Sequence, residues 1–268
     1  MLSIRFKKEG NVFMKQDIND RINEVVLWLR EQVNNCGAKG LVVGISGGVD
    51  SAVVACLIKQ AFPNNSLGVI LPIKSDIKDI KDGNLSIKTC DIECLEIDLK
   101  EEHNSIMEKV ITQLDNKSIF NDNTKRIMDA NLRARLRMST LYAIANNLNY
   151  LVVGTDNKAE IYTGYFTKYG DGGVDLQPIA ELKKHEVYEW ARILGVPNEV
   201  IDKEPSAGLW KGQTDEKEMG TTYEKIDLYL EGKPIPEKDL KIIQKMHKNS
   251  AHKRTIPPSP KLTHCSGE

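Results

Sequence analysis

The sequence predicts a doubly wound α/β fold, in which helices flank a parallel sheet. Four short aliphatic runs are continuous rather than alternating, as is typical of parallel strands buried on both faces; they lie at 41–46, 67–73, 94–99 and 150–155. Helical patterns separate these runs, and this alternation is the mark of a parallel sheet. Because 40% of the 268 residues are hydrophobic, we expect one domain with a sizeable core over residues 1–268.

The expected helices carry apolar residues three and four positions apart. They span 17–33, 52–62, 125–147 and 182–194. In the first helix, for example, Ile18, Ile22 and Val25 fall on one stripe. Residues 1–13 are then expected to be an N-terminal extension, and residues 255–268 an extended tail.

Composition and charge exclude several classes of protein. The net charge of -1 argues against bulk electrostatic binding to nucleic acid or to an anionic membrane, although a local basic pocket remains compatible with it. No apolar run reaches the roughly 18 residues of a membrane span. The N-terminus has no apolar signal core followed by a cleavage site. We therefore expect a cytoplasmic protein.

The cysteines do not suggest a disulfide framework. Their odd number and scattered spacing favour thiols instead; they are Cys36, Cys56, Cys90, Cys94 and Cys265. Cys90 and Cys94 stand four apart, but no second pair has the spacing of a zinc site. We therefore expect buried or unreactive thiols.

The stretch "LVVGISGGVDS" at 41–51 joins the first strand to a helix. Its glycines allow the backbone to approach an anion, and the following helix offers free N–H groups. The residues that would serve a phosphate are Gly44, Ser46, Gly47, Gly48 and Ser51. The lysine of a Walker A loop is absent, which disfavours a kinase or GTPase. The alternative is a plain strand-to-helix turn.

Asp50 is the unusual member of this turn. A carboxylate beside a phosphate is repulsive unless a divalent cation lies between them. The turn therefore predicts Mg²⁺ as well as phosphate.

The string "SGGVDS" resembles the pyrophosphate-binding loop of the ATP pyrophosphatases, which have a Rossmann-like fold of the adenine nucleotide alpha-hydrolase type. The resemblance implies cleavage of ATP between the α- and β-phosphates and activation of an acceptor as an adenylate. NAD synthetases, GMP synthetases, asparagine synthetases and tRNA thiolases share the loop, so the loop alone does not choose among them.

The second half of the chain indicates which of these families the sequence resembles. From about residue 17 onward the sequence resembles the ammonia-dependent NAD synthetases, through "NLRARLRM" (131–138), "GTDNKAEIYTGYFTKYGDGGVDLQP" (154–178), "LKKHEVYEWARILGVP" (182–197), "EPSAGLW" (204–210), "TYEKIDLYLEG" (222–232) and "HKR" (252–254). "FTKYGDGG" is the most specific string. The resemblance implies a homodimeric ligase that converts deamido-NAD⁺ to NAD⁺ with ATP, Mg²⁺ and ammonia, through an adenylated intermediate, and that releases AMP and pyrophosphate.

The resemblance also implies roles for residues of this chain. Metal ligands would be Asp50 and Glu160. ATP would contact Gly44, Ser46, Gly47, Gly48, Ser51, Thr155, Lys184 and Ser206, where Ser206 stands in place of a frequent threonine. Deamido-NAD⁺ would contact Arg135, Lys168, Asp175, His252 and Lys253. Catalytic roles fall to Asp50, Lys184 and Asp175.

Several of these residues also allow simpler interpretations. Arg133 and Arg137 are four apart and share a helix face, whereas Arg135 points away from it, so the three could form a solvated basic face. Lys183 is as suitable as Lys184 on spacing alone. Alone, Glu160 would more often be a surface acid.

The chemistry predicts two further features. An adenylate must be protected from water, so we expect a closing lid, with residues 75–84 and 204–220 as candidate loops. Glutamine-dependent relatives use an added amidotransferase domain with a nucleophilic cysteine, and none of the five cysteines here lies in such a context. The expected nitrogen source is free ammonia or a separate glutaminase.

Two classes of alternative remain. One is another ATP pyrophosphatase, such as a tRNA thiolase or a protein like GMP synthetase. A thiolase would need paired catalytic cysteines and a basic RNA-binding surface, which this composition disfavours. The other is a non-catalytic protein that binds adenine nucleotides, which the presence of Asp50, Glu160 and Lys184 disfavours.

Overall fold

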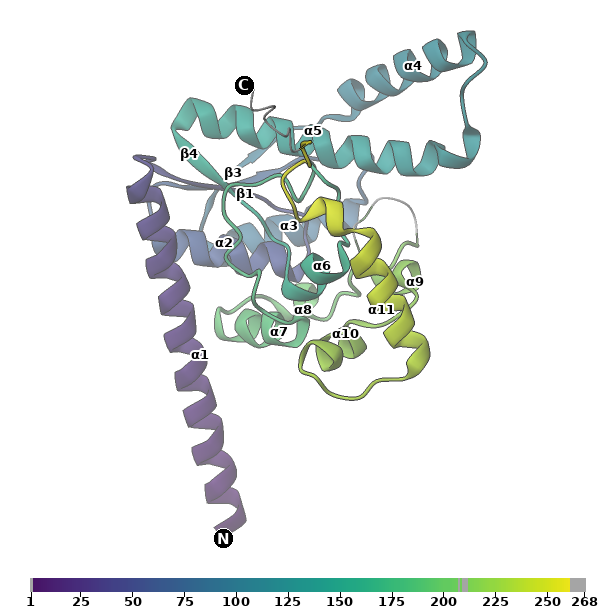
Figure 1. Cartoon of the computed structure of the whole chain (residues 1–268). Coiled ribbons are helices and arrows are strands. Elements are labelled where there is room, and N and C mark those ends of the chain that lie inside the picture. The colour runs from purple at the N-terminus through teal and green to yellow at the C-terminus, as the bar shows by residue number, and fades with distance from the viewer. Residues whose placement is uncertain (1, 207, 209–211, 261–268) are drawn as a thin grey trace, which may run out of the picture.

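A parallel four-stranded sheet forms the centre of the computed structural model, which describes residues 2–206, 208 and 212–260 (Figure 1). Its order is β3-β2-β1-β4, with β1 at Gly40–Gly44, β2 at Ser66–Ile70, β3 at Glu93–Glu96 and β4 at Tyr150–Val153. Leu41 pairs with Ser66 on one side and with Leu151 on the other. The predicted α/β class and all four strands are confirmed, and the strand order reverses between β1 and β4.

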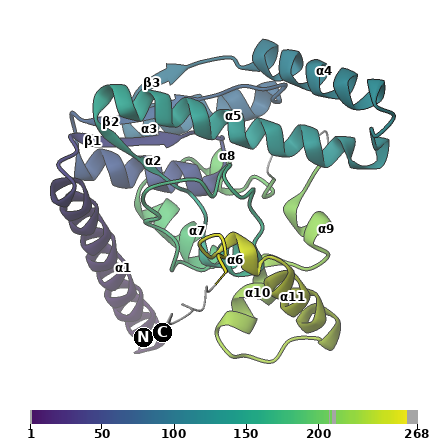
Figure 2. The ribbon, with the colours of Figure 1, turned by 45° about the horizontal axis from the view of Figure 1, so that its top comes forward.

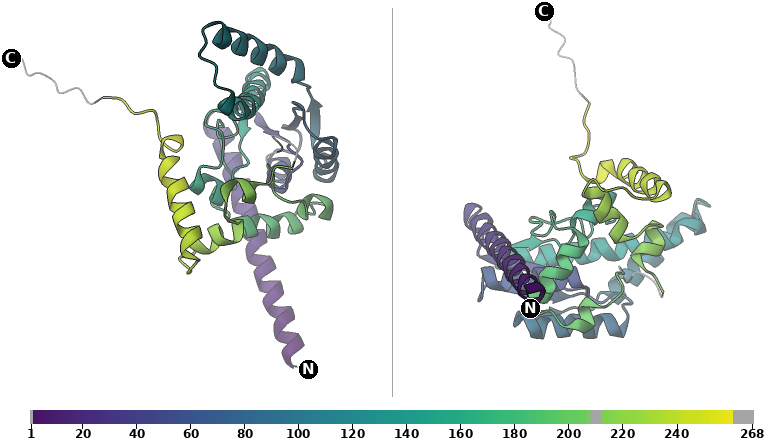
Figure 3. Two further views of the ribbon diagram at one scale, coloured as in Figure 1. Left: turned by 90° about the vertical axis from the view of Figure 1, so that its right-hand side faces the viewer. Right: turned by 90° about the horizontal axis from the view of Figure 1, so that it is seen from below.

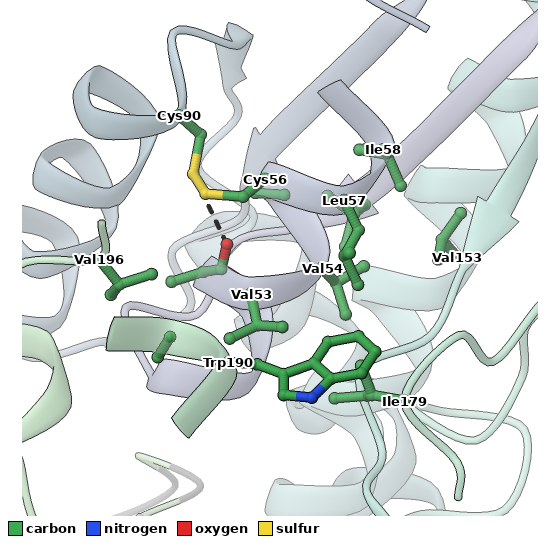
Figure 4. Close-up of a cluster of buried hydrophobic side chains, with 14 of the residues drawn as sticks. Val53, Val54, Cys56, Leu57, Ile58, Cys90, Val153, Ile179, Trp190 and Val196 are labelled. Carbon is green, nitrogen blue, oxygen red and sulfur yellow. Dashed lines mark hydrogen bonds between the residues drawn. A yellow bond between two sulfur atoms is a disulfide. The ribbon is translucent and has the colours of Figure 1, made fainter. Parts of the chain in front are cut away.

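Five of the described helices lie on one side of the sheet. They are α1 (Leu2–Asn35), α2 (Val49–Ala61), α3 (Ile77–Cys90), α7 (Lys184–Ile193) and α8 (Asn198–Ile201). Helices α2 and α3 contact the strands, and the other three pack on α2. Leu29, Leu57 and Trp190 are buried in the cluster that these helices form with the sheet. Figure 4 shows the Trp190 ring beside Val53 and Ile179. This packing fixes the start of α2, and with it the glycine-rich turn.

The other face is covered by α5 (Lys125–Leu148), which packs on β1 and β4. Leu141 and Ala145 of α5 meet Val42 and Val152 of the sheet in a second buried cluster. Helix α4 (Lys100–Asn116) runs beside α5, and the short η1 (Asp122–Thr124) connects the two (Figure 2).

The C-terminal part forms a small cluster of its own beside the carboxyl ends of the strands. It contains α6 (Lys158–Thr163), α9 (Asp215–Met219), α10 (Tyr223–Leu230), α11 (Glu237–Asn249) and η2 (Ala251–Lys253). Ala159, Ile226 and Ile243 are its buried centre. The Tyr162 ring stacks on His247 with centroids 4.1 Å apart. This cluster holds α6, and therefore Glu160, in place.

Some segment boundaries differ from the expected ones. The first helix begins at Leu2, so residues 2–13 continue it, and Figure 3 shows its first turns projecting beyond the other helices. Residues 77–84 belong to α3 rather than to a loop, because the Asp76 carboxylate caps that helix by accepting a hydrogen bond from Lys78 N at 2.8 Å. The other candidate lid ends in α9, and its residues 207 and 209–211 lie outside the described part. The same holds for residues 261–268 of the tail.

The cysteine prediction was wrong for one pair. Cys56 of α2 and Cys90 at the end of α3 form a disulfide across a Cα–Cα distance of 5.0 Å (Figure 4). The two are 34 residues apart, and only the packing of α3 on α2 brings them together, so local spacing gave no signal. Cys36 and Cys94 are free thiols, and Cys265 lies outside the described residues.

No helix in the described ranges is both long and apolar enough to cross a membrane.

Candidate active site

A cavity of about 520 Å³ opens where β1, β2 and β4 end. Its walls include Gly44 at the end of β1, Leu71 after β2 and Thr155 after β4. Ligands of open α/β sheets bind at the carboxyl ends of the strands where the strand order reverses, and the gap between β1 and β4 is that position. Ten predicted site residues line the cavity: Gly44, Ser46, Gly48, Asp50, Ser51, Thr155, Glu160, Lys184, Ser206 and Lys253.

The glycine-rich turn is held together by its own serines. Ser51 Oγ donates to Gly48 O at 2.9 Å and accepts a hydrogen bond from Ser46 N at 3.3 Å. Since the Ser51 hydroxyl hydrogen is thus engaged, the 3.1 Å contact between the two hydroxyls requires Ser46 Oγ to be its donor. Gly48 N donates to Ser46 Oγ at 3.2 Å. The hydroxyls and the amide that could contact a phosphate are therefore gathered at the start of α2.

Gly47 allows this turn to exist. Its φ of +80° lies in the region that favours glycine. A Cβ at this position would also lie 2.3 Å from the carbonyl oxygen of Asp79, at the first turn of α3. The turn and α3 therefore approach each other more closely than any side chain would permit.

Lys184 joins the two predicted metal ligands. Its Nζ lies 2.6 Å from Asp50 Oδ2 and 3.6 Å from Glu160 Oε1, and its side chain is only 4% exposed. Burial alone would lower the pKa of the Lys184 ammonium, but the two carboxylates outweigh burial and raise it above its ordinary value. The three side chains form a buried cluster with one positive charge between two acids.

Glu160 is positioned by the capping box of α6. Its Oε2 accepts from Asn157 N at 3.0 Å, and its Oε1 accepts from the Tyr223 hydroxyl at 2.9 Å. Asn157 Nδ2 also donates to Asp50 Oδ1 at 2.9 Å, so one residue orients both acids. Burial raises the pKa of Glu160 to about 7, partly offset by Lys184. The simpler interpretation of Glu160 as a surface acid is therefore wrong.

The ambiguity between neighbouring lysines is also resolved. The Lys183 ammonium lies 2.6 Å from Glu231, away from the cavity, and contributes nothing to its lining. Lys184 is the first residue of α7, and its side chain lies in the cavity. Lys183 is therefore a natural control for Lys184.

Three of the arginines of α5, namely Arg133, Arg135 and Arg137, separate as their spacing predicts. Arg133 donates to Ile73 O at 3.3 Å, and Arg137 donates to Leu71 O at 3.0 Å, so both reach the segment after β2. Arg137 also lines the cavity, where burial lowers its pKa to about 10. Arg135 points elsewhere and donates to Lys168 O at 3.3 Å.

Arg135 belongs to a basic strip outside the cavity. The Lys168 ammonium donates to His252 O at 2.5 Å, which brings together residues from α5, the loop after α6 and η2. Lys253 turns inward from the end of this strip and donates to Gly164 O at 2.8 Å. Four of the residues predicted to contact the dinucleotide are therefore neighbours.

Asp175 lies apart from the cavity lining. Its carboxylate accepts hydrogen bonds from Val152 N at 2.8 Å and from the Tyr142 hydroxyl at 2.9 Å. Its backbone is also bonded to β4. These contacts tie the loop to the sheet, and the predicted catalytic role of Asp175 stays a prediction.

Sequence reasoning missed two acids that line the cavity, the buried Asp156 and the more exposed Asp171. Burial raises the pKa of Asp156 well above its ordinary value, and the acids Asp171, Glu160 and Asp50 add to the effect. Its Oδ2 is buried without a hydrogen-bond partner. Burial likewise raises the pKa of Asp171, although Thr167 N donates to it at 2.9 Å. Asp156 directly follows the fourth strand in "GTD", a position that could have marked it.

The donor set of the cavity fits a magnesium site completed by a ligand. Asp50 and Glu160 already share the Lys184 ammonium. Mg²⁺ is usually bound by one or two carboxylates together with phosphate oxygens and water. No group of three or more His, Cys, Asp or Glu side chains, among those the structure describes, is arranged to hold a metal alone. A metal in this cavity would therefore depend on its substrate.

Comparison with known proteins extends these observations. The sequence profile of the family described as NAD synthase matches residues 21–257. An NH(3)-dependent NAD(+) synthetase from Alkaliphilus oremlandii (strain OhILAs) is 72% identical over 249 residues, which is 93% of this chain and 100% of that protein. The structure of NMN synthetase from Francisella tularensis is 39% identical with a TM-score of 0.84, covering 91% of this chain and 99% of that one. An NH3-dependent NAD synthetase from Campylobacter jejuni, in complex with the nitrate ion, is 28% identical with a TM-score of 0.72 and the same coverage.

Proposed function

Because the chain belongs to the NAD synthase family, we propose that it converts deamido-NAD⁺ to NAD⁺ with ATP and ammonia. The nicotinate carboxylate attacks the α-phosphorus of ATP, and pyrophosphate leaves. Ammonia then attacks the mixed anhydride, AMP departs and a proton is released. Adenylation is needed because a free carboxylate is a poor electrophile for ammonia at neutral pH.

One observation carries the proposal: a buried lysine and two acids lie beside a phosphate-type turn. Ser46, Ser51 and the Gly48 amide can receive phosphate oxygens at the start of α2. The Lys184 ammonium reaches the same space and can offset the charge that grows on the leaving pyrophosphate. The protein's contribution is thus to position the reactants and to stabilise charge.

Asp50 and Glu160 are the residues that would hold Mg²⁺. When bound, the ion supplies positive charge beside the phosphates of ATP. Asn157 and Tyr223 fix the two carboxylates in advance, so neither has to reorganise when a metal–nucleotide complex arrives.

The basic strip is the proposed site for the dinucleotide. The exposed Arg135 and His252 and the half-buried Lys168 are neighbours next to the cavity, and Lys253 leads into it. Guanidinium and ammonium groups suit the phosphates of deamido-NAD⁺.

We further propose that the enzyme is a cytoplasmic homodimer. Support for the dimer comes from exposed apolar side chains on the paired helices α4 and α5, namely Ile106, Val110 and Ile127. Ile127 also lines the cavity, so a partner that covers this face would close the cavity mouth.

A mononucleotide substrate is the second candidate. One similar structure is described as an NMN synthetase, and its identity to this chain, 39%, exceeds the 28% of the Campylobacter NAD synthetase. Nicotinate mononucleotide carries the same reactive carboxylate as deamido-NAD⁺. Comparing kcat/KM for the two acids decides between them.

The deciding experiment is a product assay with ATP, Mg²⁺ and either acid substrate. Ammonium is compared with glutamine as nitrogen source, and NAD⁺ or NMN is quantified with AMP by chromatography. Equal amounts of NAD⁺ and AMP with ammonium alone would support the proposal. Amide formation from the mononucleotide only would favour the second candidate. No amide from either acid, despite ATP binding, would refute both.

A further inference from the structure

Lys203 contacts two segments that are distant from it in sequence, the glycine-rich turn and the start of α3. It follows α8, and its ammonium donates to Gly47 O at 3.1 Å and to Asp79 Oδ1 at 2.7 Å. It forms a second ion pair with Asp82 Oδ2 at 2.9 Å. The turn and the first turns of α3 are thus joined by a single side chain.

The Lys203 ammonium is charged and lies among acceptors of the turn and of α3. Its side chain is 15% exposed, and burial alone would lower its pKa. Asp79 and Asp82 outweigh burial and raise the pKa above its ordinary value. An ammonium has three N–H donors, and three oxygen atoms surround this one within 3.1 Å. Lys203 borders the cavity, but its two hydrogen bonds and its ion pair with Asp82 all go to the glycine-rich turn and to α3.

The hydrogen bond from Lys203 to Gly47 O fixes the direction of the Gly48 N–H. The peptide bond between Gly47 and Gly48 is planar and trans, so its C=O and N–H point in opposite directions. When Lys203 holds the Gly47 carbonyl on the α3 side, the Gly48 N–H points away from Lys203, toward Ser46 Oγ, which lines the cavity. A peptide between two glycines rotates with little steric resistance, so its orientation needs an external anchor.

We propose that Lys203 is a positioning residue that fixes the Gly47–Gly48 peptide so that the Gly48 amide faces the pyrophosphate portion of ATP. This inference rests on the proposed function only in naming that ligand. Lys203 acts through the turn and does not touch substrate.

A purely structural role for Lys203 makes a different prediction. Lys203 also neutralises Asp79 and Asp82, and its removal would leave the half-buried Asp79 and the buried Asp82 without this cation. A triple variant, Lys203→Met with Asp79→Ala and Asp82→Ala, removes this repulsion and introduces no side-chain donor near Gly47 O. The two roles therefore separate in this variant.

The test measures Mg²⁺–pyrophosphate binding by isothermal titration calorimetry, together with Tm, for the whole chain. We expect Lys203→Met to weaken pyrophosphate binding by about tenfold, the effect of one well-oriented hydrogen bond. The triple variant should recover Tm but not pyrophosphate affinity. The Kd of deamido-NAD⁺ should stay unchanged in both variants. Lys225→Met, which removes an ion pair to Asp239 far from the turn, serves as the matched control.

Two outcomes would overturn the proposal. One is full pyrophosphate affinity in the triple variant, which would make Lys203 a charge neutraliser. The other is an equal loss of pyrophosphate affinity in the Lys225→Met control. If Lys203→Met fails to fold, the triple variant still decides. Because the readout is pyrophosphate binding, it is independent of the product assay: absence of NAD⁺ formation by the unmodified chain would refute the proposed function and leave this inference to its own test.

Discussion

Replacing Lys184 with methionine removes the only cation that Asp50 and Glu160 share among the described side chains. Methionine keeps a similar length, so the change is mainly one of charge. Removing one partner of a buried ion pair costs about 3–5 kcal/mol in unfolding free energy. For a chain of this size that corresponds to a fall in Tm of roughly 6–20 °C. The 2.6 Å contact with Asp50 and the 4% exposure of the lysine place it in this buried class.

The same substitution should slow the reaction. A fixed donor that faces developing charge contributes about 2.7–4 kcal/mol to the transition state, so we expect kcat/KM to fall by about 10²–10³-fold. The assay follows NAD⁺ formation at varied ATP, with Tm measured by differential scanning calorimetry. Lys183→Met is the control, since that ammonium contacts Glu231 outside the cavity. If the two variants have equal kcat/KM and equal Tm, the assignment of Lys184 to the cavity charge cluster is refuted.

Three further predictions concern other parts of the structure. Gly47→Ala should abolish pyrophosphate binding or folding, because the added Cβ would lie 2.3 Å from a backbone carbonyl oxygen. Gly37→Ala is the control: this residue also has a positive φ, +68°, but lies in open space, so only the strain of a left-handed residue, about 1–2 kcal/mol, is expected. Calorimetry on both variants separates the steric clash from the backbone strain. Asp156→Asn should raise Tm at neutral pH, because burial raises the pKa of Asp156 and the cost of folding therefore grows as pH rises above the ordinary aspartate range. The gain should vanish as pH falls below that range, and a gain that persists at low pH would contradict this reasoning. Reducing the Cys56–Cys90 disulfide should lower the unfolding free energy by about 3–4 kcal/mol for a loop of 34 residues, and a Tm that does not respond to dithiothreitol would contradict it.

Features that depend mainly on residues close together in sequence could be predicted. Continuous aliphatic runs identified all four strands, although only β1 and β2 are buried along most of their length. Strand β4 is partly buried, and the edge strand β3 is largely exposed. The turn at Gly47 was found because a positive φ and a close approach both demand glycine. Helix α4 escaped prediction because it buries only His103 and Met107 and so has a weak apolar stripe.

Features that depend on distant contacts could not be predicted. Lys184 and Lys183 are adjacent in sequence, and only the position of α7 separates cavity from surface. Lys203 lies 156 residues from Gly47, and no spacing rule connects them. Arg137 was seen as part of a helix face, but the segment after β2 decides that it borders the cavity.

The serines of the glycine-rich turn have a consequence for product release. Ser46 and Ser51 bond to each other and to the turn, so an arriving phosphate exchanges existing partners rather than capturing free donors. Such an exchange yields little net free energy per contact. When pyrophosphate departs, the hydroxyls can return to each other and no buried donor is stranded. Weak net binding of a highly charged product favours its dissociation, and the next catalytic cycle can then begin sooner.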